Sequence, residues 1–230
     1  MTSFDLSLYH YIVVAIIGFL WGGIPTAYLI GLYRGGLDLR SLGSGNLGAS
    51  NVFQYLGTGP GLIVGVFDCF CKGTVPIWAM QYIGLELATQ CTFALLVLIG
   101  HNWSPFLNFT GGRGISTSIG IILGFGLWIE WLILVVFLGF IGRIIIKDTA
   151  LWTLFALLLL PILCYIFDQS GEIVFTTVVM GVIALLKRVT SNCILPMVGI
   201  PRYKVYICRL IWDRDISDKE IWLNQTPNIK

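Results

Sequence analysis

Long runs of apolar residues, each about the length needed to cross a lipid bilayer, dominate this sequence. A bilayer core of ~30 Å requires about 20 apolar residues in a helix. Clear candidates are 8–33, 59–83, 86–105, 149–167 and 171–187. Composition agrees, because 57% of the residues are hydrophobic and only 11% are charged, too few for the polar surface of a soluble domain. We therefore expect an all-α integral membrane protein.

The apolar stretch 114–146 needs a separate interpretation. As one helix it would be about 50 Å long at 1.5 Å per residue, well beyond the bilayer core. Glu130 also interrupts its middle. Two short spans, or a re-entrant pair, fit this stretch better. The sequence then predicts a seven-transmembrane-helix bundle in which some spans are short or broken.

The distribution of basic residues predicts the orientation of these spans. Basic residues follow every second span, namely Arg34 and Arg40, Arg113, Arg143 and Lys147, and finally Lys187 and Arg188. The intervening ends carry only acidic residues. Because cytoplasmic connections are enriched in Lys and Arg, we expect the N-terminus outside and the C-terminus in the cytoplasm of a multi-pass plasma-membrane protein.

The pattern also predicts how the chain is divided. Residues 1–195 should form the seven-helix membrane domain, and 196–230 a cytosolic C-terminal tail. The basic residues and tryptophans of this tail are compatible with binding to an anionic membrane surface. A solvated tail fits them equally well.

The connection that follows the first span is dense in glycine and small polar residues. It contains G-x-G-x-x-G at 43–48, but a dinucleotide fingerprint should follow a strand, and here a membrane helix precedes it. Gly43 and Gly45 allow close backbone approach, and backbone amides with Ser44, Asn46 and Asn51 could bind an anion. A plain flexible loop is the alternative.

A pair of opposite charges lies inside the second span. Asp68 precedes Lys72 by one helical turn, so the two side chains can pair. Charges within a membrane span are costly and usually functional. Gly73 and Pro76 weaken the helix at this point. Lys72 is thus a candidate ligand for an anion with Asp68 as its support, although a structural ion pair would leave the same pattern.

A third polar connection follows the span 86–105. It begins with His101 and Asn102 and reaches the turn Gly111-Gly112-Arg113-Gly114. Backbone N–H groups and the Arg113 guanidinium suit an anion. His101 could act as an acid or base, or be an interfacial ring bonded to the backbone.

These three connections place cations and glycine turns at one cytoplasmic mouth. Arg40, Lys72 and Arg113 could together bind more than one phosphate. An anionic site at the membrane points to a reaction on a lipid headgroup, with the acyl chain remaining in the bilayer. The six cysteines show no paired spacing of a zinc site or disulfide framework, and we expect no metal, cofactor or nucleic acid.

The three motifs, in this order and spacing, resemble the bacterial acyl-phosphate-dependent glycerol-3-phosphate acyltransferases, the PlsY family. The resemblance runs to about residue 195 and implies a seven-helix fold whose active site faces the cytoplasm. It implies transfer of a fatty acyl group from acyl phosphate to the sn-1 hydroxyl of glycerol 3-phosphate, giving lysophosphatidic acid. A functional link to an enzyme that produces acyl phosphate would follow.

The same resemblance implies roles for individual residues. Catalytic roles fall to Ser44, Arg40, His101 and Asn102, with Asp68 in support. Phosphate binding falls to Gly43, Gly45, Asn46, Asn51, Lys72, Gly73, Gly111, Gly112, Arg113, Gly114 and Asn192.

The chain departs from the family pattern at several positions. Gln54 lies near a position where the family often has Arg, and Arg188-Val189 stands where an Arg-His pair is common. Arg113 replaces a usual Lys, and Thr149-Ala150 replace usual serines. Each lost charge-assisted contact should weaken phosphate binding by about 1.5–3 kcal/mol.

Other functions compete with this interpretation. A coenzyme-A-dependent acyltransferase needs a carboxylate five residues after a histidine. Five residues after His101 is Phe106 and five after His10 is Ala15, so the sequence argues against this class. A divergent paralogue with another acceptor or reduced activity remains open because of Gln54 and Val189. A transporter would explain the broken helices and the embedded charge pair.

Overall fold

The computed structural model describes residues 3–136, 149–191 and 200–218. Within these ranges the chain is helical and has no strand, which confirms the all-α prediction. Three helical runs are long and apolar enough to cross a membrane: Tyr9–Gly35, Thr58–Tyr82 and Gly171–Thr190. Ile115–Gly124 and Ala150–Ile166 are shorter apolar helices. The count of seven membrane spans and the orientation of the termini remain predictions.

The described residues contain eleven α-helices and three short helical segments. The α-helices are α1 Ser3–Gly23, α2 Thr26–Gly35, α3 Ala49–Leu56, α4 Thr58–Val66, α5 Val75–Tyr82, α6 Leu87–Asn102, α7 Ile115–Gly124, α8 Trp128–Val135, α9 Thr149–Ile166, α10 Gly171–Thr190 and α11 Arg202–Trp212. The short segments are the 3₁₀ turns η1 Leu39–Ser41 and η3 Pro105–Leu107 and the π-helical segment η2 Phe67–Thr74.

The first apolar run is divided at Pro25, which separates α1 from α2. Proline has no backbone N–H and cannot continue the hydrogen-bond ladder of a helix. The carbonyl of Ile24 lies in this break, where it accepts from Thr26 N at 3.0 Å and from Lys72 Nζ at 2.7 Å. The break thus creates one side of the site described below.

The second apolar run is continuous but changes its winding. The π-helical segment η2 lies between α4 and α5, directly before Pro76. Because Pro76 cannot donate to the carbonyl of Lys72, the ladder must adjust at this point. Thr74 Oγ1 donates to the carbonyl oxygens of Cys69 and of Gly120 on α7, at 3.3 and 2.9 Å.

The stretch 114–146 is broken, as its length predicts. The break separates α7 from α8 and includes Gly126, which has a φ of 76°. Glu130 does not interrupt the helix: it lies in the first turn of α8, buried, and accepts a hydrogen bond from Gln169 Nε2 at 2.9 Å. Residues 137–148, including Arg143 and Lys147, lie outside the described part.

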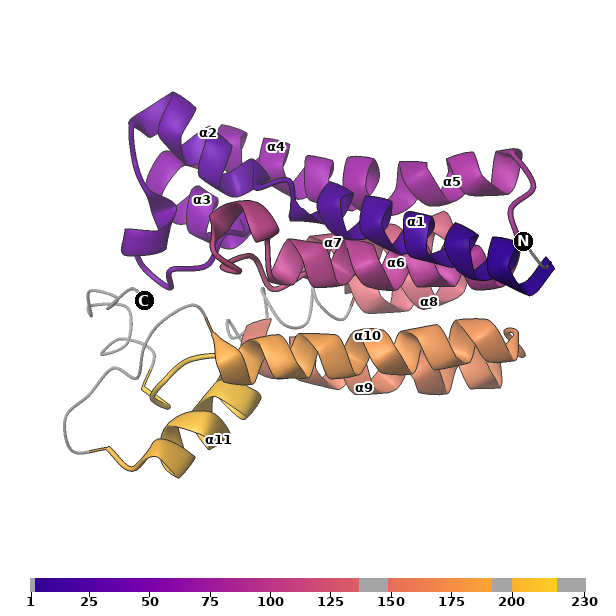
Figure 1. Cartoon of the computed structure of the whole chain (residues 1–230). Helices are drawn as coiled ribbons and strands as arrows, with labels where there is room; N and C mark the ends of the chain where they lie inside the picture. The colour runs from indigo at the N-terminus through magenta and orange to yellow at the C-terminus, as the bar shows by residue number, and fades with distance from the viewer. Residues whose placement is uncertain (1–2, 137–148, 192–199, 219–230) are drawn as a thin grey trace.

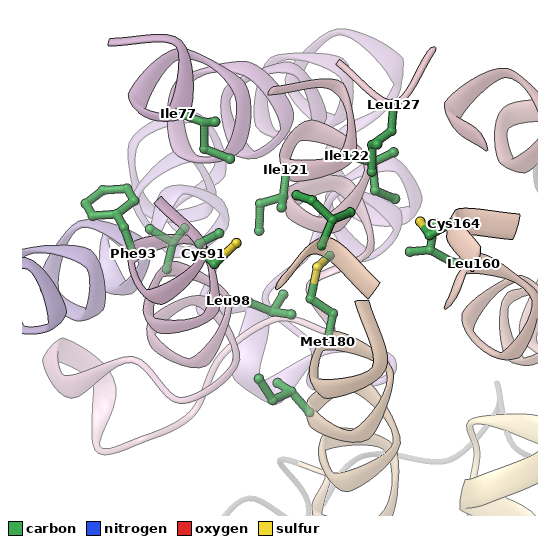
Figure 2. Close-up of a cluster of buried hydrophobic side chains, with 14 of the residues drawn as sticks. Ile77, Cys91, Phe93, Leu98, Ile121, Ile122, Leu127, Leu160, Cys164 and Met180 are labelled. Carbon is green, nitrogen blue, oxygen red and sulfur yellow. The ribbon is translucent and has the colours of Figure 1, made fainter. Parts of the chain in front are cut away.

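Close helix crossings hold the bundle together. A Cβ added at Gly22 of α1 would lie 2.0 Å from the carbonyl oxygen of Val97 on α6, and one at Gly100 would lie 2.0 Å from that of Phe19. Small residues permit this approach, which supplies packing energy where lipid removes the hydrophobic drive between helices. Figure 2 shows the main apolar core, where side chains such as Ile77, Leu98 and Met180 meet from α5, α6 and α10.

The polar connections gather at one end of the bundle. Figure 1 shows α2, α3 and α11 at this end, whereas α1 begins at the opposite end. A second core supports these connections, formed by Ala27, Leu39, Leu47, Val52, Val64 and Leu107. The helix α11, from the expected tail 196–230, packs against α9 and α10. The division of the chain at residue 195 itself stays a prediction.

Candidate active site

A buried ion pair forms one side of the site. Asp68 Oδ1 lies 2.8 Å from Lys72 Nζ, and both side chains are only 2% exposed. The expected pairing across one helical turn is therefore present, although a π-helical turn carries it. Thr26 Oγ1 also donates to Asp68 Oδ1, at 3.2 Å. The pair thus connects η2 to the break between α1 and α2.

His101 extends this pair towards the glycine turn. Its Nδ1 lies 3.4 Å from Lys72 Nζ and 3.8 Å from Asp68 Oδ1. Because an ammonium only donates, Nδ1 is the acceptor in this contact and a neutral ring carries its proton on Nε2. A Cβ at Gly112 would lie 2.2 Å from Nε2, so only glycine leaves room for the imidazole. His101 is thus a buried member of the charged cluster.

Backbone hydrogen bonds bring two of the predicted loops together. Leu47 N donates to the carbonyl of Gly111 at 3.3 Å, and Gly112 N donates to that of His101 at 3.0 Å. Gly43, Gly45 and Gly114 have φ values of 56°, 65° and 73°, in the left-handed region that glycine adopts without steric cost. The glycines of both motifs therefore shape the loops that surround the site.

Arg113 is the cation at the centre of these loops. With the Asn46 amide oxygen turned towards it, Asn46 accepts from Arg113 Nε at 2.6 Å and Nη2 at 2.7 Å. Arg113 also forms an ion pair with Asp213, a hundred residues further along the chain. Ser44 Oγ accepts from Asn46 N at 3.3 Å, which places the serine beside this pair.

These groups open onto a cavity of about 560 Å³. The predicted residues on its wall are Ser44, Asn46, Asn51, Asp68, His101, Arg113 and Gly114. Residues from the three motifs thus meet at one cavity. Gln54 lines it too, with a neutral amide.

Several predicted residues lie away from the cavity wall. Arg40 pairs with Asp38 at 2.7 Å and lies over the ring of Tyr28. Gly73 packs against α7, where a Cβ would meet the backbone of Gly120 at 2.8 Å. Lys72 is covered by its partners. Gly43, Gly45, Gly111 and Gly112 shape the loops from behind, and Asn192 lies outside the described residues. The functional roles of all these residues stay predictions.

Two buried asparagine side chains have unusual surroundings. Asn51 Nδ2 donates to the carbonyls of Leu39 and Leu42, both at 3.1 Å, while its Oδ1 has no hydrogen-bond partner among the described residues. Asn102 is fully buried, and neither of its amide atoms finds a partner within that same part of the chain. An unsatisfied buried amide typically costs about 1–3 kcal/mol. Asn51 itself lines the cavity, while its Oδ1 is a buried atom that faces Gly43.

The cavity also contains residues that sequence reasoning missed. Arg188, Trp212, Asp213 and Arg214 line it, from the end of α10 and from the segment that ends α11. In the sequence Arg188 served as a marker of the cytoplasmic side and as part of the Arg188-Val189 departure from the family pattern, and the other three residues belonged to the tail. Apart from the charges, no local pattern links these positions to the glycine motifs.

Sequence comparison identifies the family. The family model described as glycerol-3-phosphate acyltransferase matches residues 12–194. The chain belongs to the glycerol-3-phosphate acyltransferase family. Glycerol-3-phosphate acyltransferase 5 of Dehalococcoides mccartyi is 35% identical over 95% of this chain and 98% of its own length. The glycerol-3-phosphate acyltransferase of Prochlorococcus marinus is 33% identical over 76% of this chain and 87% of its own length.

Solved structures agree with this family. The crystal structure of PlsY (YgiH), an integral membrane glycerol 3-phosphate acyltransferase in its glycerol 3-phosphate form, matches with a TM-score of 0.69. It is 26% identical, and the match covers 77% of this chain and 88% of that one. The expected resemblance to the PlsY family is therefore confirmed, and the apolar helices belong to a membrane protein. The transporter and altered-acceptor alternatives gain no support from these relatives.

Proposed function

We propose that this protein transfers a fatty acyl group from acyl phosphate to the sn-1 hydroxyl of glycerol 3-phosphate. The products are lysophosphatidic acid and inorganic phosphate, the first step of phospholipid synthesis. The observation that carries the proposal is the cavity, which joins Ser44, Asn46 and Arg113 at the end of an apolar bundle. Family membership and the relatives' names support the same activity.

A narrow apolar pocket of about 30 Å³, large enough for only a short part of an acyl chain, adjoins the cavity. Ile115, Ile119 and Thr153 line both the polar cavity and this smaller pocket. The pocket continues between α7, α9 and α10, with Leu157 and Met180 on its wall. A donor with a phosphate headgroup and an acyl chain needs such a pair of adjoining environments.

The reaction requires little covalent chemistry from the protein. The hydroxyl oxygen of glycerol 3-phosphate attacks the acyl carbonyl carbon and forms the ester bond. The bond from this carbon to the phosphate oxygen breaks, and a substrate phosphate accepts the hydroxyl proton. Because acyl phosphate is already activated, positioning two repelling phosphates and stabilising the developing oxyanion supply the catalysis.

The geometry divides these tasks among the residues. Ser44, Asn46 and Arg113 line the cavity and can donate hydrogen bonds to phosphate or to the carbonyl oxygen, and Asn51 lies on the same wall. Lys72 and Asp68 hold His101 from behind. Arg40 pairs with Asp38 away from the cavity wall, so its proposed role is to position η1, which precedes the loop that contains Ser44.

The cavity's place in the membrane follows from the charge pattern. We place seven spans in the plasma membrane with the N-terminus outside and the C-terminus in the cytoplasm. The end that contains α2, α3 and α11 then faces the cytoplasm, where glycerol 3-phosphate is dissolved (Figure 1). An enzyme that produces acyl phosphate would supply the donor.

Phosphate release in lipid mesophase or detergent tests the function. The purified protein should release phosphate from palmitoyl phosphate only when glycerol 3-phosphate is added. Glycerol, which lacks the phosphate, should not replace it. Release that is independent of every acceptor, or no release at all, would refute the proposed activity.

A further inference from the structure

The chain beyond the family match forms part of the cavity wall. The family model ends at residue 194, yet Trp212, Asp213 and Arg214 line the cavity that also contains Ser44. Arg214 is only 8% exposed, so its guanidinium lies within the protein and not in bulk solvent. The end of α11 therefore contributes a cation to the site.

Hydrogen bonds fix this segment to the membrane helices. Arg188 of α10 donates to the carbonyls of Leu210 at 3.1 Å and Ala150 at 2.8 Å. Arg209 of α11 donates to the carbonyl of Val189 at 3.2 Å and forms a buried ion pair with Asp215. Because these contacts join α9, α10 and α11, the wall is preorganised.

A turn at the end of α11 directs the chain into the site. Asp213 has a φ of 56°, and its N–H donates to the carbonyl of Arg209 at 3.0 Å. The turn lets the Asp213 carboxylate pair with Arg113 and sets the Arg214 guanidinium 5.5 Å from the centre of the Trp212 ring. Attraction to the face of an aromatic ring holds a guanidinium in place.

The charges of the cavity give Arg214 its role. Arg113 and Arg214 both line the cavity, and Asp213, which pairs with Arg113, offsets one of these positive charges. Two phosphates in one cavity require further positive charge, and a guanidinium matches phosphate with two parallel hydrogen bonds. Building on the proposed function, we infer that Arg214 binds a substrate phosphate, so that α11 is part of the substrate site.

Steady-state kinetics on the full-length protein test this inference. Arg214→Gln should raise the KM for one phosphate substrate by roughly tenfold or more, the effect of losing one charge-assisted hydrogen bond, with a smaller change in kcat. Arg214→Lys should recover part of the loss. Varying acyl phosphate and glycerol 3-phosphate separately shows which phosphate Arg214 binds. Unchanged KM values for both substrates would overturn the inference.

A matched control separates binding from folding and from net charge. Lys204→Gln removes the same charge from an exposed position on α11 and should leave both KM values unchanged. Inorganic phosphate should raise the unfolding temperature of the wild type and of Lys204→Gln, but raise that of Arg214→Gln much less. Equal protection of all three would overturn the inference, even if the wild type showed no acyl transfer. Arg214 would have a structural role instead if Arg214→Gln and Arg214→Lys lowered the unfolding temperature equally and phosphate then raised it equally in both variants.

Discussion

At the scale of single residues, the ion pair between Asp68 and Lys72 is the costliest feature of the site. Both groups are removed from solvent; within the described residues their charges balance each other, and Thr26, Ile24 and His101 add polar contacts. Removing one partner of a buried pair leaves an uncompensated charge, typically at a cost of about 3–5 kcal/mol. A substitution at Asp68 or Lys72 should therefore change the stability of the protein as well as the geometry of the site.

Lys72→Met should abolish acyl transfer and lower the unfolding temperature, because Asp68 is left charged and buried. The double variant Asp68→Asn/Lys72→Met removes both charges and should recover much of the stability but none of the activity. Thermal unfolding in detergent and the phosphate-release assay measure the two effects. Equal stability of the single and double variants would contradict the charge-pair account.

Asp38 and Arg40 give a pH-dependent contribution outside the membrane helices. Hydrogen bonds from Arg40 lower the pKa of the Asp38 carboxyl below its ordinary value. Its folded pKa is therefore below the unfolded value of about 3.9, so the contribution is present above about pH 4 and lost as pH falls through the folded pKa. The pair is partly solvated, which limits the effect to about 1 kcal/mol or less.

Asp38→Asn tests this sign. The variant should be less stable than the wild type at pH 7, and the difference should shrink below about pH 4. Unfolding curves at several pH values measure it. A stability difference that is constant with pH would show that the Asp38 charge plays no part.

The types of residue in the site were readable from the sequence, but many of their contacts were not. Asp68 and Lys72 are one turn apart, so their pairing could be predicted. Arg40 lies in a motif with Ser44, yet its guanidinium turns back to Asp38. The direction of a side chain in a loop depends on local capping, which a motif does not specify.

At the scale of helices, close packing of η2 against α7 positions Asp68 and Lys72. A Cβ at Gly120 would lie 1.9 Å from the carbonyl oxygen of Cys69. Thr74 Oγ1 donates to the Gly120 carbonyl across the same contact. The winding of η2 therefore depends on a glycine in another helix.

Gly120→Ala should push these two segments apart and destabilise the protein by about 1–3 kcal/mol or more, as overpacking does. Activity should fall with it, because Lys72 moves. Gly65→Ala is the control, since its Cβ would lie at an ordinary 3.5 Å from that of Ala49. Matching unfolding temperatures for the two variants would count against this packing role.

Helix breaks were predictable in part. Length and Glu130 together indicated that 114–146 is interrupted, but the break contains Gly126, and Glu130 is a helical residue buried against Gln169. Pro25 divides the first run, and Pro76 follows the π-helical segment. Sequence marks such positions, whereas the type of helix on either side depends on packing with neighbours such as Gly120.

At the scale of the whole molecule, the site is assembled from segments far apart in the chain. Arg113 meets Asp213, and Arg188 bonds to Leu210. The sequence predicted that the three polar motifs meet at one end of the bundle. It gave no indication that α11 forms part of the cavity wall. Only tertiary packing brings residues a hundred positions apart together, so this part of the site required the structure.

Reporter fusions test the proposed orientation. Green fluorescent protein fused to the C-terminus should fluoresce, and alkaline phosphatase fused there should be inactive, because the end that contains α11 faces the cytoplasm. Alkaline phosphatase, which is active only outside the cytoplasm, should be active when it is fused to the N-terminus. An active C-terminal phosphatase would contradict the orientation and the cytoplasmic site.

The most direct test of the central claim is the stoichiometry of products formed from palmitoyl phosphate and glycerol 3-phosphate. The wild type should form one lysophosphatidic acid, acylated at sn-1, for each phosphate released. Ser44→Ala should stay folded and lose most of this turnover, because Ser44 lies at the cavity beside Asn46 and Arg113. Phosphate release without lysophosphatidic acid, or full turnover by Ser44→Ala, would contradict the account.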